Sequence, residues 1–341
     1  MFIILTSEND PFGLFLAFRR VRDPDRERVR PSFVPGRRPV LGDRLERVGA
    51  LSRPARPDEG RGVAGLDLLA VKEDPDPGDA APVVGDHRNG RPAVLADELP
   101  VLGRRTRLGV FPIGVDVEPV QQEARQSLAS DGVKRMSSGL LGRRCVIGVD
   151  RLDYSKGLVD RFLAYERYME DHPESLNRIT FLQIAPLSRA DVRTYAEIRR
   201  TLEQAAGRIN GRFADTDWTP IRYLNRNFSH ETLMGFLRNA CAGVVTPVRD
   251  GMNLVAKEFV AAQDPADPGV LVLSTLAGAA EEMSDALLVN PRDPRAVADA
   301  VHQALTMPLD ERRARHERLL QVLRRNDIHA WHGRFVQQLQ A

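Results

Sequence analysis

The stretch RCVIGVDRLDYSKGLVDRFLAYERYMEDHPESLNRITFLQIA, residues 144–185, decides the fold class of this chain. Its two ends, residues 144–150 and 179–185, are short and almost continuously apolar, as is typical of strands buried on both faces of a sheet. Residues 158–171 between them repeat apolar side chains at helical spacing. A strand, a helix and a second strand in this order predict a βαβ unit with parallel strands.

The same alternation continues toward the carboxyl terminus. Further strand-like runs lie at residues 221–225, 243–248, 269–274 and 287–290, and helical segments lie at residues 190–209, 229–240, 253–263, 294–307, 309–325 and 328–339. We therefore expect an α/β fold with a Rossmann-like parallel sheet over residues 140–310 and closing helices over residues 311–341. Such sheets bind ligands in the crevice beyond the carboxyl ends of their strands.

The amino-terminal third of the chain has a different composition. Residues 1–107 hold 12 of the 23 prolines, and they carry 18 arginines but only one lysine, Lys72. They show neither the period of a strand nor that of a helix. We expect residues 1–103 to be an Arg- and Pro-rich segment that is poorly ordered or forms a small irregular domain.

The charge balance limits the classes of partner. The 341 residues include 49 basic and 47 acidic ones, which argues against a nucleic-acid protein held mainly by phosphate neutralisation.

No apolar run approaches the roughly 18 residues of a membrane span. The start MFIILTSEND lacks a basic region, and the two cysteines, Cys145 and Cys241, make no disulfide framework. We expect a reduced cytoplasmic protein without nucleic-acid or membrane partners; a homo-oligomer stays open.

Two cations follow the first strand of the predicted sheet. Arg151 and Lys156 lie five residues apart, just ahead of Gly157. Arginine can bind phosphate oxygens with two hydrogen bonds and lysine supplies a compact charge, so this loop suits a diphosphate. Its spacing differs from that of a Walker loop. The alternative is a surface loop in which Asp150 and Asp153 form ion pairs with these cations.

The strand at residues 243–248 leads into the most informative loop. Gly251 allows a close backbone approach, and the helix that follows begins near Asn253, so its free N–H groups can hold an anion. Asp250 is either a plain N-cap of that helix or an acceptor for the hydroxyls of a ligand. Glu258 can accept two hydroxyls of a ribose or can be an ordinary exposed helix charge, and Lys257 beside it is a weaker candidate.

The remaining candidates carry weaker signals. Arg189 follows the strand at residues 179–185, where a lone arginine is more often solvated than functional. The seven histidines show no spacing typical of a metal site, and we expect no metal ion or other cofactor. His230 and Glu231 read as the start of a helix with Ser229 as its cap.

Six motifs, taken together, carry a specific resemblance. The segments VDRLDYSKG, FLQIAPLSR, AGRING, TPVRDGMNLVAKEFVAAQDP, PGVLVLSTLAGAAEEM and ALLVNPRD occur in the order found in the carboxyl-terminal half of the α,α-trehalose-phosphate synthases. These enzymes are retaining glycosyltransferases with two Rossmann-like domains, the GT-B architecture. The resemblance covers residues 104–341, and FPIGVD at residues 111–116 resembles the end of the family's amino-terminal half. Residues 104–139 are then a remnant of that domain and a linker.

The resemblance implies a reaction and a set of roles. Enzymes of this family transfer glucose from UDP-glucose to glucose 6-phosphate, giving trehalose 6-phosphate and UDP without a metal ion. Arg151 and Lys156 match the diphosphate-binding pair, Arg189 the contact to the acceptor phosphate, and Asp250 the acid that holds the glucose hydroxyls. Arg151, Lys156 and Asp250 are thus the implied catalytic residues. The other implied donor contacts are the backbone amides of Gly251, Met252 and Asn253, the ribose ligand Glu258, and Leu233 and Val255 around the uracil.

The chain also departs from the family. Residues 1–103 contain no counterpart of the Gly-rich loop, of the Trp and Tyr contacts to glucose 6-phosphate, or of the HDYHL-like strand end with its catalytic His and Asp. Two other functions therefore stay open. One is a catalytically impaired nucleotide-sugar-binding fragment of the family, and the other is a related transferase with another acceptor or with ADP-glucose as donor.

Overall fold

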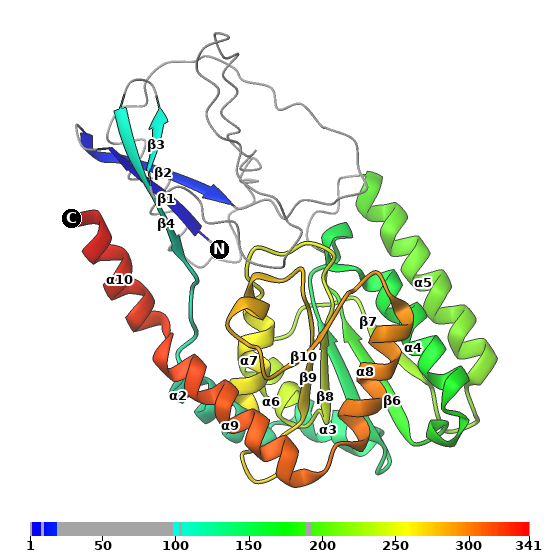
Figure 1. Ribbon diagram of the computed structural model, residues 1–341. Helices are drawn as coiled ribbons and strands as arrows, with labels where there is room; N and C mark the ends of the chain where they lie inside the picture. Colours follow the sequence, from blue (N-terminus) through cyan, green and yellow to red (C-terminus); the bar gives the residue numbers. More distant parts are fainter. Residues whose placement is uncertain (1, 8–9, 19–97, 102–103, 188–192, 341) are drawn as a thin grey trace. The chain divides into compact units, whose positions relative to one another are not determined.

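The computed structural model describes residues 2–7, 10–18, 98–101, 104–187 and 193–340 (Figure 1). Most of the segment 1–103 lies outside these residues. Four strands are described within residues 1–111: β1 (Phe2–Ser7), β2 (Asp10–Phe18), β3 (Glu98–Val101) and β4 (Arg104–Phe111). β1 pairs with β2 and β3 pairs with β4, both antiparallel. The sequence patterns did not indicate these strands.

The predicted Rossmann-like sheet is confirmed. Its six strands are β5 (Arg144–Val149), β6 (Ile179–Ile184), β7 (Ile221–Leu224), β8 (Ala242–Val245), β9 (Val270–Ser274) and β10 (Leu287–Val289). They run parallel in the order β10-β9-β8-β5-β6-β7. Every residue of β6, β8 and β9 is buried, which explains why these strands read as continuous apolar runs.

The strand order predicts where a ligand binds on this sheet. From β5 the chain proceeds outward on one side through β6 and β7, then returns to β8 on the other side of β5. In an open parallel sheet, this reversal leaves a crevice at the carboxyl ends of the two central strands. The loops that follow β5 and β8 therefore border the expected binding site.

Helices cover both faces of the sheet (Figure 1). α4 (Leu158–Asp171), α5 (Arg193–Phe213) and α8 (Pro294–Thr306) contribute to one hydrophobic core. α6 (His230–Arg238), α7 (Leu254–Ala262) and α9 (Leu309–Arg325) contribute to the core on the opposite face. Strand β5 serves both cores, because Cys145 and Ile147 point to one face and Val146 to the other.

Two helices in the expected linker belong to the second core. α2 (Val117–Gln126) buries Val117, Val120 and Ala124, and α3 (Asp131–Gly139) buries Val133. Ser130 caps α3 by accepting a hydrogen bond from the backbone N–H of Val133, at 3.4 Å. Both helices contact α6, so this part of the segment 104–139 packs on the sheet domain.

The carboxyl terminus forms a last helix, α10 (Ile328–Gln340). Its Trp331 indole donates a hydrogen bond to the carbonyl of Phe111 at 3.2 Å, and the Phe335 ring packs edge-on against the Phe111 ring. Among the described residues, no helix has the length and apolar character needed to cross a membrane.

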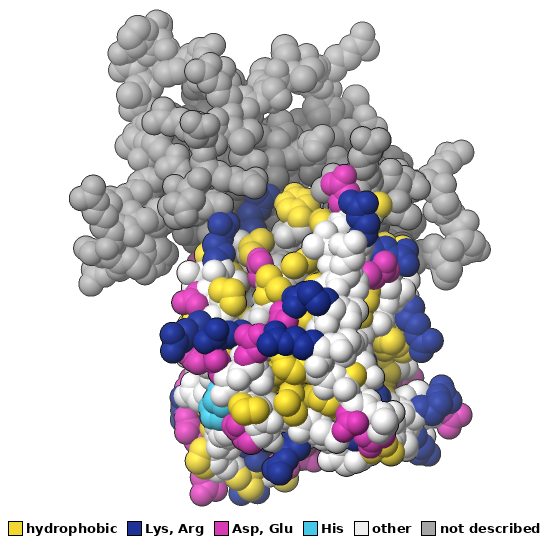
Figure 2. Space-filling model, turned by 90° about the vertical axis from the view of Figure 1, so that its right-hand side faces the viewer, with side chains coloured by type: hydrophobic (Ala, Val, Ile, Leu, Met, Phe, Trp, Pro, Cys, Tyr) yellow, Lys and Arg dark blue, Asp and Glu magenta, His cyan; other side chains and the backbone are white. Residues whose placement is uncertain are grey.

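Basic and acidic side chains lie interspersed on the face that Figure 2 shows. Among the ion pairs of α4 and α5, Arg208 holds both carboxylate oxygens of Glu166, and Arg212 pairs with Glu170. Glu166 is buried and held at both oxygens, whereas the Arg212–Glu170 pair is more exposed and contributes little to stability on its own.

Candidate active site

The loops after β5 and β8 are bound to each other at the carboxyl ends of these strands. The carbonyl of Ser155, in the first loop, accepts hydrogen bonds from the backbone N–H groups of Val248 and Arg249 in the second, at 2.9 and 3.1 Å. The two anion sites expected from the sequence, at residues 151–156 and 251–253, thus belong to neighbouring loops. This arrangement follows from the strand order, since β5 and β8 are adjacent.

The first loop has a fixed local shape. Asp153 accepts hydrogen bonds from the N–H and hydroxyl of Ser155, both at 2.9 Å, and so caps the short 3-10 helix η2 (Tyr154–Lys156). Gly157 then adopts a φ of 61°. A Cβ atom at Gly157 would lie 2.6 Å from the carbonyl oxygen of Thr246, so only glycine permits this approach of the two loops.

Lys156 and Asp250 form an ion pair across the two loops. The Nζ of Lys156 lies 2.6 Å from the Oδ2 of Asp250, which also accepts a hydrogen bond from the side-chain amide of Asn253 at 3.0 Å. Asn253 caps α7 by accepting from the N–H of Ala256. The alternative interpretation of Asp250 as a plain N-cap is therefore wrong: Asp250 lies one turn earlier and faces Lys156.

A buried arginine that the sequence did not single out supports the first loop. Arg161 of α4 has a fully buried side chain that donates to the carboxylate of Asp150 at 2.7 Å, to Gln183 at 3.0 Å and to the hydroxyl of Thr246 at 2.9 Å. It also donates to the carbonyl of Lys156 at 3.3 Å. Burial raises the pKa of Asp150, and the charge of Arg161 opposes that shift.

The alternative interpretation, in which the carboxylates of this loop pair with its cations, holds in part. Asp150 binds Arg161, and the Nζ of Lys156 lies 4.0 Å from Asp150, a longer distance than to Asp250. Arg151 is exposed at the end of β5. Asp150 is thus engaged mainly with Arg161 of α4, and Asp153 accepts hydrogen bonds from Ser155 within the loop.

Glu258 is linked to two other elements through a histidine. The Nε2 of His230, at the start of α6, lies 3.6 Å from the Oε1 of Glu258, and its Nδ1 lies 2.6 Å from the Oε2 of Glu123 on α2. The Glu258 side chain is 21% exposed, so it is not an ordinary solvated helix charge. Leu233 and Val255 are partly buried and pack against the core beside it.

The two carboxylates make the stability of the fold depend on the protonation of His230. Glu258 first, then Glu123, raises the pKa of His230 from 6.5 to about 9. A raised pKa in the folded state gives stability that is fully present below pH 6.5 and is lost as the pH rises through 9. We expect His230→Gln to lower the Tm by a few degrees at pH 6 and progressively less up to pH 10, in scans with His332→Gln as control. A constant deficit would contradict this linkage.

Of the remaining sequence candidates, the structure describes Lys257 but not Arg189. Lys257 is buried, and its Nζ donates to the carbonyl of Ile113 at 2.8 Å and to Glu282 at 2.6 Å. Lys257 therefore holds α7 to the segments that carry Ile113 and Glu282, and it is not a cation that faces a ligand. Arg189 lies outside the described residues.

The chain is similar in sequence and in structure to known proteins. Residues 93–341 match glycosyltransferase family 20. Trehalose-6-phosphate synthase of Klebsiella pneumoniae is 51% identical over 238 residues, which are 70% of this chain and 50% of the relative. A UDP-forming α,α-trehalose-phosphate synthase from Burkholderia xenovorans, solved in complex with glucose-6-phosphate, is 48% identical with a TM-score of 0.71, over 72% of this chain and 54% of that one. A structure from E. coli, bound with UDP-2-fluoro glucose, is 45% identical with a TM-score of 0.68, over 75% of this chain and 55% of that one.

These matches confirm the α/β glycosyltransferase fold expected from the motifs, for the part of the chain that they cover. The chain spans about half the length of the curated relatives it matches. The family match nevertheless covers well over half of the 341 residues, including both loops of the crevice. The chain therefore belongs to glycosyltransferase family 20, together with the trehalose-6-phosphate synthases that it resembles.

Proposed function

We propose that this chain binds UDP-glucose at the crevice between the loops after β5 and β8. The observation that carries the proposal is the ion pair of Lys156 with Asp250, at 2.6 Å, between loops bound to each other at the switch point of the sheet. A cation for the diphosphate and a carboxylate for sugar hydroxyls are thereby neighbours. A relative bound with UDP-2-fluoro glucose supports the choice of donor.

The roles of the other site residues follow from the family motifs. Arg151 and Lys156 bind the diphosphate, the amides of Gly251, Met252 and Asn253 lie beside the glucose, and Asp250 accepts its hydroxyls. Glu258 accepts the ribose hydroxyls, and Leu233 and Val255 border the uracil. Arg189, outside the described residues, takes the acceptor phosphate. These assignments rest on the family motifs together with the convergence of the loops.

The reaction in question is glucosyl transfer to glucose 6-phosphate with retention, which gives trehalose 6-phosphate and UDP. The bond from the glucose anomeric carbon to the diphosphate breaks while a bond to the acceptor oxygen forms on the same face. The acceptor proton passes to the departing phosphate oxygen. Negative charge grows on the leaving diphosphate, so Arg151 and Lys156 stabilise the transition state more than the ground state. A relative in complex with glucose-6-phosphate supports this acceptor.

A second function has an observation of its own. The chain matches about half the length of its curated relatives, and the family match begins at residue 93. A nucleotide-sugar-binding fragment with impaired transfer is therefore the competing proposal. Both proposals share the donor site and differ in turnover, so binding and catalysis must be measured separately.

The donor site is tested by calorimetry with UDP and with uridine, each with and without EDTA. We expect UDP to bind in both cases, because no step of the proposed binding needs a metal ion. Arg151→Ala should weaken UDP by about tenfold to a hundredfold, since a hydrogen bond to a charged group contributes about 1.5–3 kcal/mol, and should leave uridine unaffected.

The matched control is Arg178→Ala, at an exposed position ahead of β6, away from the carboxyl ends of the strands. It should leave both affinities unchanged. Equal losses of UDP and uridine affinity in Arg151→Ala would refute the diphosphate assignment. Absence of any heat with UDP from folded protein would refute the donor site itself.

A further inference from the structure

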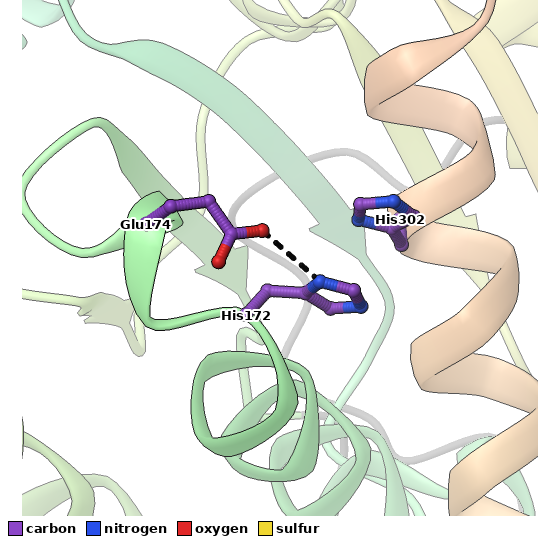
Figure 3. Close-up of side chains that lie close together, drawn as sticks. All are labelled: His172, Glu174 and His302. Carbon is purple, nitrogen blue, oxygen red and sulfur yellow. Dashed lines mark hydrogen bonds and ion pairs between the residues drawn. The ribbon is translucent and has the colours of Figure 1, made fainter.

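Three side chains that offer metal ligands lie close together (Figure 3). They are His172 at the carboxyl end of α4, Glu174 in the 3-10 helix η3 (Pro173–Ser175), and His302 of α8. One ligand atom from each lies within 4.8 Å of the others. In a βαβ unit the carboxyl end of the helix returns to the amino ends of the strands, so this cluster is remote from the crevice.

The backbone holds the three residues in place. The N–H of His172 donates to the carbonyl of Tyr168 at 3.0 Å, and the carbonyl of His172 accepts from the N–H and the hydroxyl of Ser175, at 2.9 and 2.6 Å. These bonds fix the turn that carries His172 and Glu174. α8 packs directly against α4, which brings His302 to the same spot.

The side chains already contact one another. The imidazole rings of His172 and His302 stack at a centroid distance of 3.7 Å and an angle of 8°. The Nδ1 of His172 lies 3.1 Å from the Oε1 of Glu174. The side chains of His172 and Glu174 are 23% and 65% exposed, so the cluster is open to solvent on one side.

This donor set suits a particular class of ion. Two imidazole nitrogens and one carboxylate oxygen fit zinc, nickel or copper, whereas magnesium and calcium prefer oxygen ligands alone. A zinc–nitrogen distance of about 2.0–2.1 Å in a tetrahedral site places ligand atoms roughly 3.4 Å apart. The ligand atoms lie within 4.8 Å of one another, so they are at most about 1.4 Å too far apart, and one ring must turn out of the stack. The partial exposure leaves room for that rotation and for a water as fourth ligand.

We propose that His172, Glu174 and His302 form a surface site for a divalent ion of the zinc class, separate from the donor site. The bound ion cross-links η3 and the end of α4 to α8. Histidines 172 and 302 are far apart in the sequence, so spacing alone gives no indication of the site. The ion takes no part in glucosyl transfer, and its effect is on the stability of the α4–α8 pair.

The test is titration of zinc chloride into the full chain after treatment with a chelator, with calorimetry and thermal melting as readouts. We expect one site per chain that is lost in His302→Ala and weakened at least tenfold in Glu174→Gln. Zinc should raise the Tm of the unchanged chain and of the control His332→Ala, and should raise that of His302→Ala far less. Magnesium should raise none of them.

Cobalt absorption gives a second readout, because visible bands of a cobalt complex report its ligands. These bands should appear in the unchanged chain and vanish in His302→Ala. Circular dichroism and UDP affinity without metal show that each variant is folded. Zinc affinity that survives in His302→Ala, equal loss in His332→Ala, or an equal shift with magnesium would each overturn the proposal.

Discussion

Arg161→Met is expected to cost the chain roughly 3–5 kcal/mol of unfolding free energy, because it leaves the buried carboxylate of Asp150 without its main partner. Arg161 is fully buried and also donates to the carbonyl of Lys156, so the variant should bind UDP more weakly than the unchanged chain. Urea unfolding monitored by circular dichroism gives the first quantity, and calorimetry gives the second.

A double variant separates the effect of the uncompensated charge on stability from the effect of the lost Lys156 contact on UDP binding. Asp150→Asn combined with Arg161→Met removes the uncompensated charge, so it should recover part of the stability while UDP affinity stays low. The matched control is Arg167→Met on the same helix, where Arg167 forms an exposed pair with Asp171 at 2.7 Å. That change should stay within about 0.5 kcal/mol. Equal losses for Arg161→Met and Arg167→Met would show that the network does not support the loop.

The sheet could be predicted because its strands are buried on both faces. A strand such as Val270–Ser274, buried at every position, must be apolar throughout, and this pattern is visible without any knowledge of its neighbours. α2 and α3 were missed because each buries only a few apolar residues. Their place depends on contact with α6, which local periodicity does not reveal.

The candidate site was predictable only in part. Strand-end loops with cations and glycines indicated Arg151, Lys156 and the residues around Asp250, because parallel strands carry ligands at one edge. The partners of these residues come from elsewhere: Arg161 binds Asp150, and His230 binds Glu258. Long-range pairs of this kind follow from the strand order and helix packing, which one sequence does not supply.

Arg161 nevertheless left a signal in the sequence. It lies three residues after Leu158 and four before Tyr165, and both of these are buried. Helical spacing places Arg161 on the same face of α4, where an arginine needs a buried partner. The burial of Arg161 was not predicted, because an arginine in an amphipathic helix is ordinarily assigned to the side that faces solvent.

The largest expected effect concerns catalysis. In a two-domain glycosyltransferase each wall of the cleft orients one substrate, and correct positioning can supply about 7–11 kcal/mol of the barrier reduction. The proposed donor site lies within the family match, but residues 1–92 lie outside it, and residues 1–103 contain no counterpart of the acceptor-orienting His, Asp and aromatic motifs. We expect the 341-residue chain to bind UDP yet to transfer glucose at least about a thousandfold more slowly than a full-length relative.

Release of UDP from UDP-glucose in the presence of glucose 6-phosphate measures this rate, with the Klebsiella pneumoniae enzyme as positive control and Arg151→Ala as background. Each factor of ten corresponds to about 1.4 kcal/mol of barrier, so a loss of about 4 kcal/mol, roughly half the positioning energy, already gives a thousandfold decrease. A turnover on the order of 10 per second would contradict the prediction, because that is the rate of an ordinary complete enzyme. It would mean that residues 1–103 supply the acceptor wall with other side chains than those of the family motifs. Slow turnover together with intact UDP binding would place the deficit in acceptor orientation, since the donor site would then be shown to work alone.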